Sequence, residues 1–242
     1  MNKKKIIAVI TARKNSKSIK NKNMIKINSK PLIQYSIDIC KKSKYVNQTL
    51  LSSDSDEIID YCKKKDLKIL FKRPFKYSKD NSTDLEVFTH LINFFIDNNI
   101  TLPNFFIHVR PTCPIRNPLV FDKAIKYFLN NLNKGYTSLR SISLAKENPY
   151  KMWQLKNNQL LPLIKNNKYQ SVPRQLIPKT YWQNGYIDIV TPKTILKGSM
   201  EGSKILPFII NETIHDIDYL TDLKNFRKFM KSRVLDDRTF PS

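Results

Sequence analysis

The feature that most constrains this sequence is the alternation of short apolar runs with amphipathic helical segments as far as residue 145. The apolar runs predict strands at residues 5–11, 48–52, 68–71, 105–109 and 137–143. Helical spacing predicts helices at residues 31–42, after a cap at Asp54 or Ser55, at 84–98, and from Asn117 to about Leu129. Strands that alternate with helices indicate parallel βαβ units. We therefore expect a three-layer α/β sandwich around a mostly parallel sheet.

The stretch from about residue 147 to residue 183 breaks this alternation. It contains Trp153, Trp182 and several prolines without a clear period. A segment of this kind needs a partner surface, so we interpret it as a protruding dimerisation arm. Strands are expected again at residues 186–190 and 205–210, and a last helix at 219–231. The predicted organisation is a single domain, 1–242, with an arm at about 147–183.

The composition is that of a globular protein, with 40% hydrophobic residues among 242. No apolar run approaches the roughly 20 residues that span a bilayer. The first apolar stretch ends at Arg13 and Lys14 without a small-residue cleavage site, so we interpret it as a strand rather than a signal peptide. The three cysteines are far apart and form no C-x-x-C pair, which fits a reducing compartment. We expect a cytoplasmic protein with no membrane partner.

The net charge of +23 admits two interpretations. A strongly basic chain can bind nucleic acid. Alternatively, the charge can belong to solvated surfaces, because lysines are scattered from end to end, with no basic tail and no aromatic-basic repeat. We favour the second interpretation and expect no nucleic-acid partner, since a basic cleft for a triphosphate needs only a few of these charges.

The loop after the first strand is the strongest local feature. Residues 12–23 (ARKNSKSIKNKN) carry one arginine and four lysines among asparagine and serine. Cationic side chains together with backbone N–H groups can bind a polyanion, although a solvated basic loop has the same composition. In parallel sheets, ligands bind beyond the carboxyl ends of the strands. That rule selects the loops after Thr11, Ser52, Phe71 and Val109.

Several motifs, in the same order along the chain, resemble those of the CMP-acylneuraminate (CMP-sialic acid) synthetases. They are residues 12–23 followed by KPLI at 30–33, SSDSDEI at 52–58, Arg73-Pro74 with Asp80 and Thr83, PTCPIR at 111–116, PRQ at 173–175, Asn184-Gly185, and DID at 216–218. Together they span nearly the whole chain. The first loop departs from the family pattern, because Lys14-Asn15 replaces Gly-Gly and Ser18 replaces Gly.

The resemblance implies a nucleotide site and a mechanism. Arg13 and Lys17 would neutralise the β- and γ-phosphates of CTP, and Lys22 would act at the α-phosphate, where charge is redistributed in the transition state. Arg73 and Asn23 would position the nucleotide and read cytosine. The full nucleotide site that the resemblance implies contains Ala12, Asn15, Ser16, Asn23, Arg73, Asp80 and Thr83.

Two carboxylates, Asp216 and Asp218, lie at positions i and i+2. In an extended segment they point to the same face, and Ile217 points to the opposite one. Hard oxygen ligands suit Mg²⁺, which phosphate oxygens also bind, so we expect Mg²⁺ as cofactor. The alternative is an acidic cap before the last helix.

The resemblance also implies a sugar site, formed by Arg110, Thr112, Arg174, Gln175, Asn184 and Asp188, with Arg174 reaching a sugar carboxylate, in its own subunit or a neighbouring one. Arg110 stands where the family usually has Gln. Asp188 stands where it has Tyr. The two side chains either pair with each other or contact the substrate.

The function that the resemblance implies is a CTP-dependent nucleotidyltransferase. It would transfer CMP from CTP to the anomeric hydroxyl of an acidic keto-sugar of the nonulosonic type and release pyrophosphate, as a homodimer. Three alternatives stay open: a CMP-Kdo-type or other acid-sugar enzyme of the same superfamily, a basic nucleic-acid-binding protein, and a catalytically silent relative.

Overall fold

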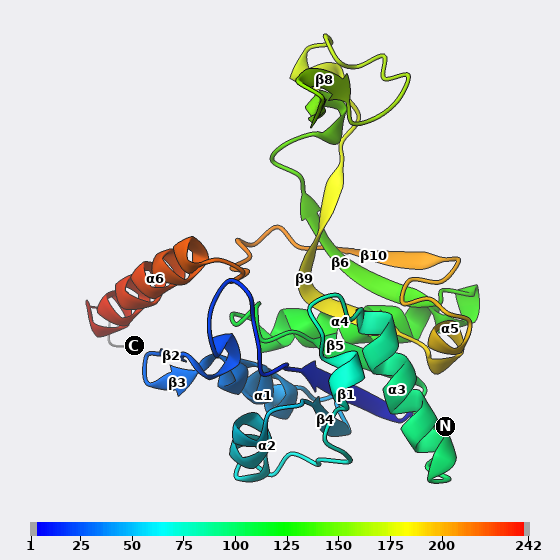
Figure 1. Cartoon of the computed structure of the whole chain (residues 1–242), viewed down its shortest axis with the longest axis vertical. Helices are drawn as coiled ribbons and strands as arrows, with labels where there is room; N and C mark the ends of the chain where they lie inside the picture. Colours follow the sequence, from blue (N-terminus) through cyan, green and yellow to red (C-terminus); the bar gives the residue numbers. More distant parts are fainter. Residues whose placement is uncertain (1–3, 240–242) are drawn as a thin grey trace.

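The computed structural model describes residues 4–239, and its centre is a six-stranded sheet with the order β10-β6-β9-β5-β1-β4 (Figure 1). The strands are β1 (Ile6–Thr11), β4 (Gln48–Ser52), β5 (Phe105–Val109), β6 (Ser138–Leu144), β9 (Tyr181–Val190) and β10 (Ile205–Ile209). β9 runs antiparallel to β5 and β6, whereas the other pairs are parallel. The prediction of a mostly parallel sheet is confirmed.

Helices cover both faces of the sheet and complete the three predicted layers. One face carries α1 (Leu32–Lys42), α2 (Asp56–Lys63) and α4 (Pro118–Asn131), and the other carries α3 (Asp84–Asp97) and α5 (Pro192–Leu196). Successive side chains of β1 point to opposite faces of the sheet. Ile6, Ala8 and Ile10 pack into the first core, and Ile7 and Val9 into the second.

Two local predictions differ from the structure. Residues 68–71 form no strand. They lie beside the edge strand β4 but pair with it at only one isolated bridge, between Leu50 and Lys68. The strand predicted at 186–190 begins at Tyr181. Its first residues pair with β6 beyond a register shift between Arg140 and Ile142, and such a bulge lets a strand bend away from the sheet.

The segment predicted as an arm protrudes from the body (Figure 1). β6 and β9 lead into it, and it ends in a separate hairpin of β7 (Trp153–Lys156) and β8 (Gln159–Pro162). Both hairpin strands are exposed along their whole length. The hairpin therefore has no core of its own within the described protein.

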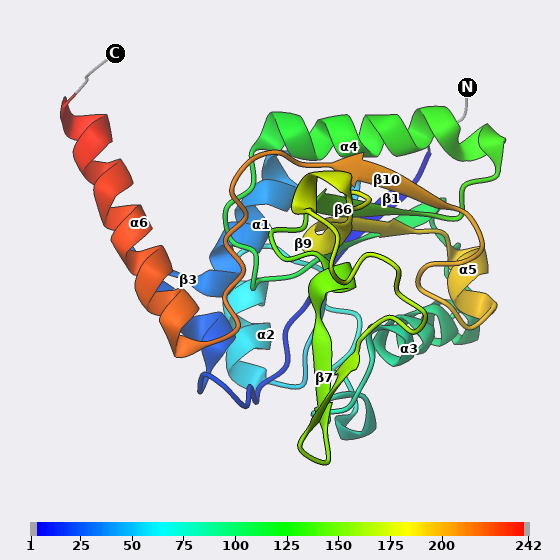
Figure 2. The ribbon, with the colours of Figure 1, turned by 90° about the horizontal axis from the view of Figure 1, so that it is seen from above.

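The last helix, α6 (Leu220–Thr239), stands at the side of the body (Figure 2). Leu223 and Phe226 pack with Ile19, Leu32 and Ile217 in a third apolar cluster. The cluster thus attaches the chain just before α6 to the first loop and to the small sheet of β2 (Lys26–Ile27) and β3 (Lys30–Pro31). Among residues 4–239, no helix combines the length and apolarity needed to cross a membrane.

Candidate active site

The basic first loop leaves the end of β1 and folds back over it. Ala12 is buried and its amide donates to the Ser52 carbonyl at 3.0 Å, so the loop starts tied to β4. The Asn23 side chain donates to the Arg13 carbonyl at 3.0 Å and holds the two ends of the loop together. Asn21 has a left-handed backbone with φ 51°, a conformation that Asn tolerates. The loop therefore tightens at Asn21 rather than at Asn15.

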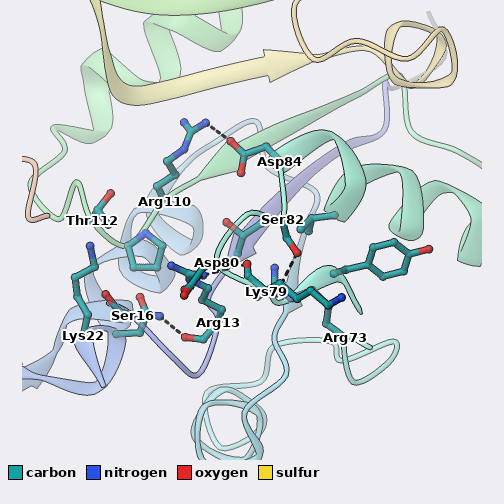
Figure 3. A pocket seen from close by; sticks show the side chains of 15 residues that line it. Arg13, Ser16, Lys22, Arg73, Lys79, Asp80, Ser82, Asp84, Arg110 and Thr112 are labelled. Carbon is teal, nitrogen blue, oxygen red and sulfur yellow. Dashed lines mark hydrogen bonds and ion pairs between the residues drawn. The ribbon is translucent and has the colours of Figure 1, made fainter. Parts of the chain in front are cut away.

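A cavity of about 280 Å³ opens at the carboxyl ends of the parallel strands (Figure 3). This is where the strand-end rule expects a ligand. It brings together Arg13, Ser16, Lys22, Asn23, Arg73, Asp80, Arg110 and Thr112, all of which the sequence had placed in the site. Lys22 and Arg73 lie on opposite sides of this cavity, with Arg13 between them (Figure 3). We call it the first cavity.

The other predicted site residues lie elsewhere. Lys17 is exposed and contacts the site through Asp80, Asn15 lies beside a neighbouring depression, and Thr83 caps α3 with its hydroxyl. Arg174 and Gln175 lie in a short 3-10 helix of the arm, η5 (Arg174–Leu176), where Arg174 pairs with Glu147 at 3.6 Å. Asn184 is buried, donates to the Ser143 hydroxyl at 2.8 Å and accepts from the Tyr186 amide at 3.1 Å.

Arg73 is buried although it carries a full charge. Its nearest carboxylate is Asp54, with 3.9 Å between Nη2 and Oδ1, and its Nε and Nη2 have no hydrogen-bond partner among the described residues. Burial lowers the pKa of this guanidinium, and the nearby Asp54 charge opposes that effect. Free buried donors facing a cavity suit a ligand with acceptor atoms. This fits the predicted contact with cytosine, which stays a prediction.

Asp80 binds the two cations predicted for the β- and γ-phosphates. Its carboxylate lies 2.8 Å from Arg13 Nη1 and 3.4 Å from Lys17 Nζ, and Arg13 also donates to the Lys79 carbonyl at 3.1 Å. A carboxylate in this place competes with a triphosphate for the same positive charges. We therefore expect Asp80 to oppose the binding of phosphate, and its predicted contact with the nucleotide stays a prediction.

Replacing Asp80 by asparagine is expected to lower the KM for CTP by about threefold, the effect of removing a half-exposed ion pair. The decrease should shrink as salt is added, because salt screens exposed charges. Steady-state kinetics at low and high ionic strength measures both effects. Asp60→Asn, which removes an exposed carboxylate 3.9 Å from Lys63 on α2, is the control. A KM that rises would mean that Asp80 contacts the nucleotide directly.

Lys22 joins the first loop to the paired carboxylates. Lying in the 3-10 helix η1 (Lys22–Met24), it donates from Nζ to Asp218 Oδ1 at 2.9 Å and to the Ile217 carbonyl at 2.9 Å. The Ile217 amide donates to the Thr112 carbonyl at 2.8 Å, and its side chain is buried in the third cluster, as the predicted alternation requires. The tandem carboxylates thus stand at the edge of the first cavity.

The paired carboxylates fit a hard cation. Asp216 is largely buried, and its Oδ1 has no hydrogen-bond partner among the described residues. Burial raises the pKa of Asp216, and the nearby Asp218 charge adds to that increase. A hydrogen bond with Thr112 and the charge of Lys22 oppose that increase only in part, and a metal ion bound at the unpartnered Oδ1 would offset the rest. Within residues 4–239 no group of three or more His, Cys, Asp or Glu side chains is suited to a metal, so phosphate oxygens would have to supply further ligands.

Arg110 and Asp188 pair with each other, which is the first of the two possibilities that the sequence left open. Nη1 of Arg110 binds Asp188, and Nη2 lies 2.7 Å from Asp84 Oδ2 (Figure 3). Both carboxylates raise the pKa of Arg110 in spite of its burial. Asp188 is fully buried and also accepts from the Gln183 amide at 3.0 Å. The guanidinium is therefore committed to two carboxylates.

Histidines contribute packing to this region. His108 is fully buried in β5, and its Nε2 lies 2.8 Å from the Thr11 hydroxyl. Burial, together with the charge of Arg110, lowers its pKa to about 4, so the ring is neutral. His90 packs between the rings of Phe71 and Tyr77.

Sequence reasoning missed several residues around the cavity. Tyr77, Lys79 and Ser82 line it from the loop before α3, and Asp84 lines it from the first turn of that helix. The only sequence signal of the first three was their place between two motif residues, Arg73 and Thr83, and Asp84 directly follows Thr83. Arg140 was also missed, because nothing in a strand sequence indicates that its side chain reaches a carboxylate on another strand.

Comparison with known proteins agrees with this geometry. A family model described as "Cytidylyltransferase" matches residues 7–197. "Post-translational flagellin modification protein B" of Campylobacter coli is 30% identical, over 97% of this chain and 99% of that protein. The "CMP-N,N'-diacetyllegionaminic acid synthase" of Campylobacter jejuni is 30% identical over the same shares.

Among solved structures, a CMP:2-keto-3-deoxy-manno-octonic acid synthetase complexed with CTP superposes with a TM-score of 0.70 at 12% identity. The match covers 95% of this chain and 99% of that one. At this identity the likeness shows the fold alone, a nucleotidyltransferase α/β fold. The family match covers the cavity residues from the first loop through α5. The chain with this basic loop and cavity belongs to the cytidylyltransferase family of CTP-dependent enzymes.

Proposed function

We propose that this enzyme transfers CMP from CTP to the anomeric hydroxyl of an acidic keto-sugar of the nonulosonic type. The observation that carries the proposal is the contact of Lys22 with Asp218 at the edge of the cavity that contains Arg13. A cation and two carboxylates at one place can serve a reaction in which charge moves along a triphosphate. The relative that is similar over its whole length and is named for a CMP-linked legionaminic acid supports the class of sugar.

The reaction is a direct displacement at phosphorus. The anomeric hydroxyl oxygen forms a bond to the α-phosphorus, the bond from that phosphorus to the bridging oxygen of the β-phosphate breaks, and the hydroxyl proton passes to water. Lys22 stabilises the negative charge that develops on the α-phosphate. Arg13 and Lys17 leave Asp80 and neutralise the departing pyrophosphate.

Asp216 and Asp218 would hold Mg²⁺. Bound there, Mg²⁺ screens the phosphate charges and lowers the pKa of the attacking hydroxyl. Because CTP is a metabolite of the cytoplasm, we place the reaction in that compartment.

The test is pyrophosphate release with CTP and a panel of acid sugars: N-acetylneuraminate, Kdo, legionaminic and pseudaminic acids. We expect CTP to be preferred over UTP and ATP, and a nonulosonic acid other than N-acetylneuraminate to have the highest kcat/KM. Kdo as the best substrate would favour the CMP-Kdo-type alternative. If none of the sugars in the panel supports pyrophosphate release, the result would favour a catalytically silent relative.

The protein is further proposed to be a homodimer that uses the arm. The hairpin exposes Leu155 and Leu160 at 73% and 61% of their surface, and Leu161 and Leu163 are also exposed. Contiguous apolar surface of this kind is typical of a protein interface. Arg174, exposed on the same arm, would then be free to reach the sugar site of a second copy.

The double substitution Leu155→Ser, Leu160→Ser is expected to convert a dimer to a monomer at micromolar concentration, because it removes the apolar tip of the arm. Sedimentation equilibrium measures the mass. Leu119→Ser, at a leucine that is 75% exposed on α4, is the matched control and should stay dimeric. A fully active wild-type monomer would contradict the proposal.

A further inference from the structure

A second cavity lies directly beyond the Arg110–Asp84 pair. Its volume is about 350 Å³, and it shares Asp84 and Arg110 with the first cavity. The pair is therefore a partition with a cavity on each side. A molecule that reacts beside Lys22 and is longer than the first cavity can extend past the partition into the second.

The wall of the second cavity contains a closed set of charges. Arg110 binds Asp84 and Asp188, and Arg140 lies 3.2 Å from Glu201 and 3.9 Å from Asp188. The two guanidinium groups and the carboxylates of Asp84 and Glu201 line the cavity, and the buried Asp188 contacts both guanidinium groups from behind. The cavity offers no uncompensated positive charge to an anion. A substrate carboxylate entering here would find no free cation and would have to give up its water.

The same wall suits a neutral group with an N–H donor and an apolar end. Glu201 is half exposed on the loop after α5, so its carboxylate can accept a hydrogen bond from a ligand. Leu85 and the buried Met200 supply apolar surface to the same cavity. An acylamino group has both features, because its amide N–H donates and its methyl group is apolar.

We propose that the second cavity is the subsite for an acylamino substituent of the sugar acid, and that Leu85 and Glu201 determine its specificity. This inference rests on the proposed function. It also assigns the acidic end of the sugar to a place outside the second cavity. The carboxylate must then find its cation on the first-cavity side of the partition or on an arm.

The experiment compares N,N'-diacetyllegionaminic acid with Kdo, which has no acylamino group. In the wild-type enzyme we expect kcat/KM to be at least about tenfold higher for the diacetyl sugar, since a site built around polar groups discriminates strongly. Leu85→Phe fills the cavity from α3. This substitution is expected to lower the ratio of kcat/KM for the diacetyl sugar to kcat/KM for Kdo by about tenfold, while the KM for CTP stays within about twofold of the wild-type value.

A second variant tests the same cavity independently if Leu85→Phe folds poorly. Glu201→Gln preserves the shape of a half-exposed side chain and should lower kcat/KM for the diacetyl sugar about threefold or more, with Kdo unaffected. The controls are Leu119→Phe on α4 and Glu57→Gln on α2, both exposed and neither among the residues that line the two cavities.

Equal losses with both sugars, or no loss in either variant, would overturn the assignment of the second cavity and leave the proposed function intact. A wild-type enzyme that releases no pyrophosphate with any acid sugar would overturn the proposed function, and the subsite with it.

Discussion

Replacing Asp218 by asparagine is expected to lower kcat by about a hundredfold or more while the fold is retained, the scale of losing one preorganised electrostatic contact in a transition state. Asp218 accepts from Lys22 and stands beside Asp216, so its charge both positions the lysine and completes the proposed Mg²⁺ site. The measurement is single-turnover CMP-sugar formation at saturating CTP, over a Mg²⁺ titration. Asp97→Asn, an exposed carboxylate at the end of α3, should leave kcat unchanged.

Asp216→Asn separates activity from stability. Activity should fall as it does for Asp218→Asn, but in EDTA the Tm should rise by about 2–4 °C, the shift that about 1 kcal/mol produces in a domain of this size. The reason is that Asp216 is half-buried, has a buried oxygen, Oδ1, without a hydrogen-bond partner among the described residues, and lies near another carboxylate. Near-normal activity of Asp218→Asn at ordinary Mg²⁺ would remove the metal assignment, and an unchanged Tm for Asp216→Asn would show that the buried charge is already compensated.

Lys22→Ala is expected to reduce kcat by about a hundredfold, with a much smaller change in the KM for CTP. The ammonium group is mostly buried, with 11% of its side chain exposed, and is fixed by Asp218 and the Ile217 carbonyl. A cation held before the reaction costs no reorganisation when charge develops, so its loss acts mainly on the chemical step. Rapid-quench measurement of the first turnover distinguishes that step from product release.

Lys20→Ala is the matched control, because Lys20 is exposed on the same loop and its replacement removes the same formal charge. It should change the KM for CTP slightly through the overall field and leave kcat unchanged. If Lys22→Ala kept its kcat, the loop would act in nucleotide binding alone.

Most of the sheet could be predicted because strands such as β1 and β5 are apolar runs next to helices with their own period. β1 and α1 are examples, since their patterns are local and their burial follows from them. The strand predicted at residues 68–71 failed for a non-local reason. A strand at the edge of a sheet needs a neighbour along its length, and this segment meets β4 at only one bridge.

The first-cavity residues were predictable for a related reason. Arg13 and Arg110 follow the ends of β1 and β5, and topology brings strand ends together, so they converge although they are far apart in the chain. Arg73 joins them from the segment after residues 68–71, which meets β4 at one bridge. What the sequence could not decide was how charges pair once they meet. Arg110 with Asp188, and Asp80 with Arg13, are contacts between loops and strands, and no spacing rule specifies them.

The pairing of β6 with β9, which resumes beyond the register shift, has a practical consequence for protein engineering. Beyond the bulge, Ser143 still pairs with Trp182 and Leu144 with Tyr181, so the root of the arm is a twisted ribbon rather than a hinge. Truncation that cut into β9 would remove Gln183 and disturb Asp188, which it contacts. Excision of residues 145–180 and closure with a tight turn would instead convert the ribbon into an ordinary hairpin. Such a shortened variant would lack the apolar tip and keep every residue that lines the two cavities, because none of them lies within 145–180.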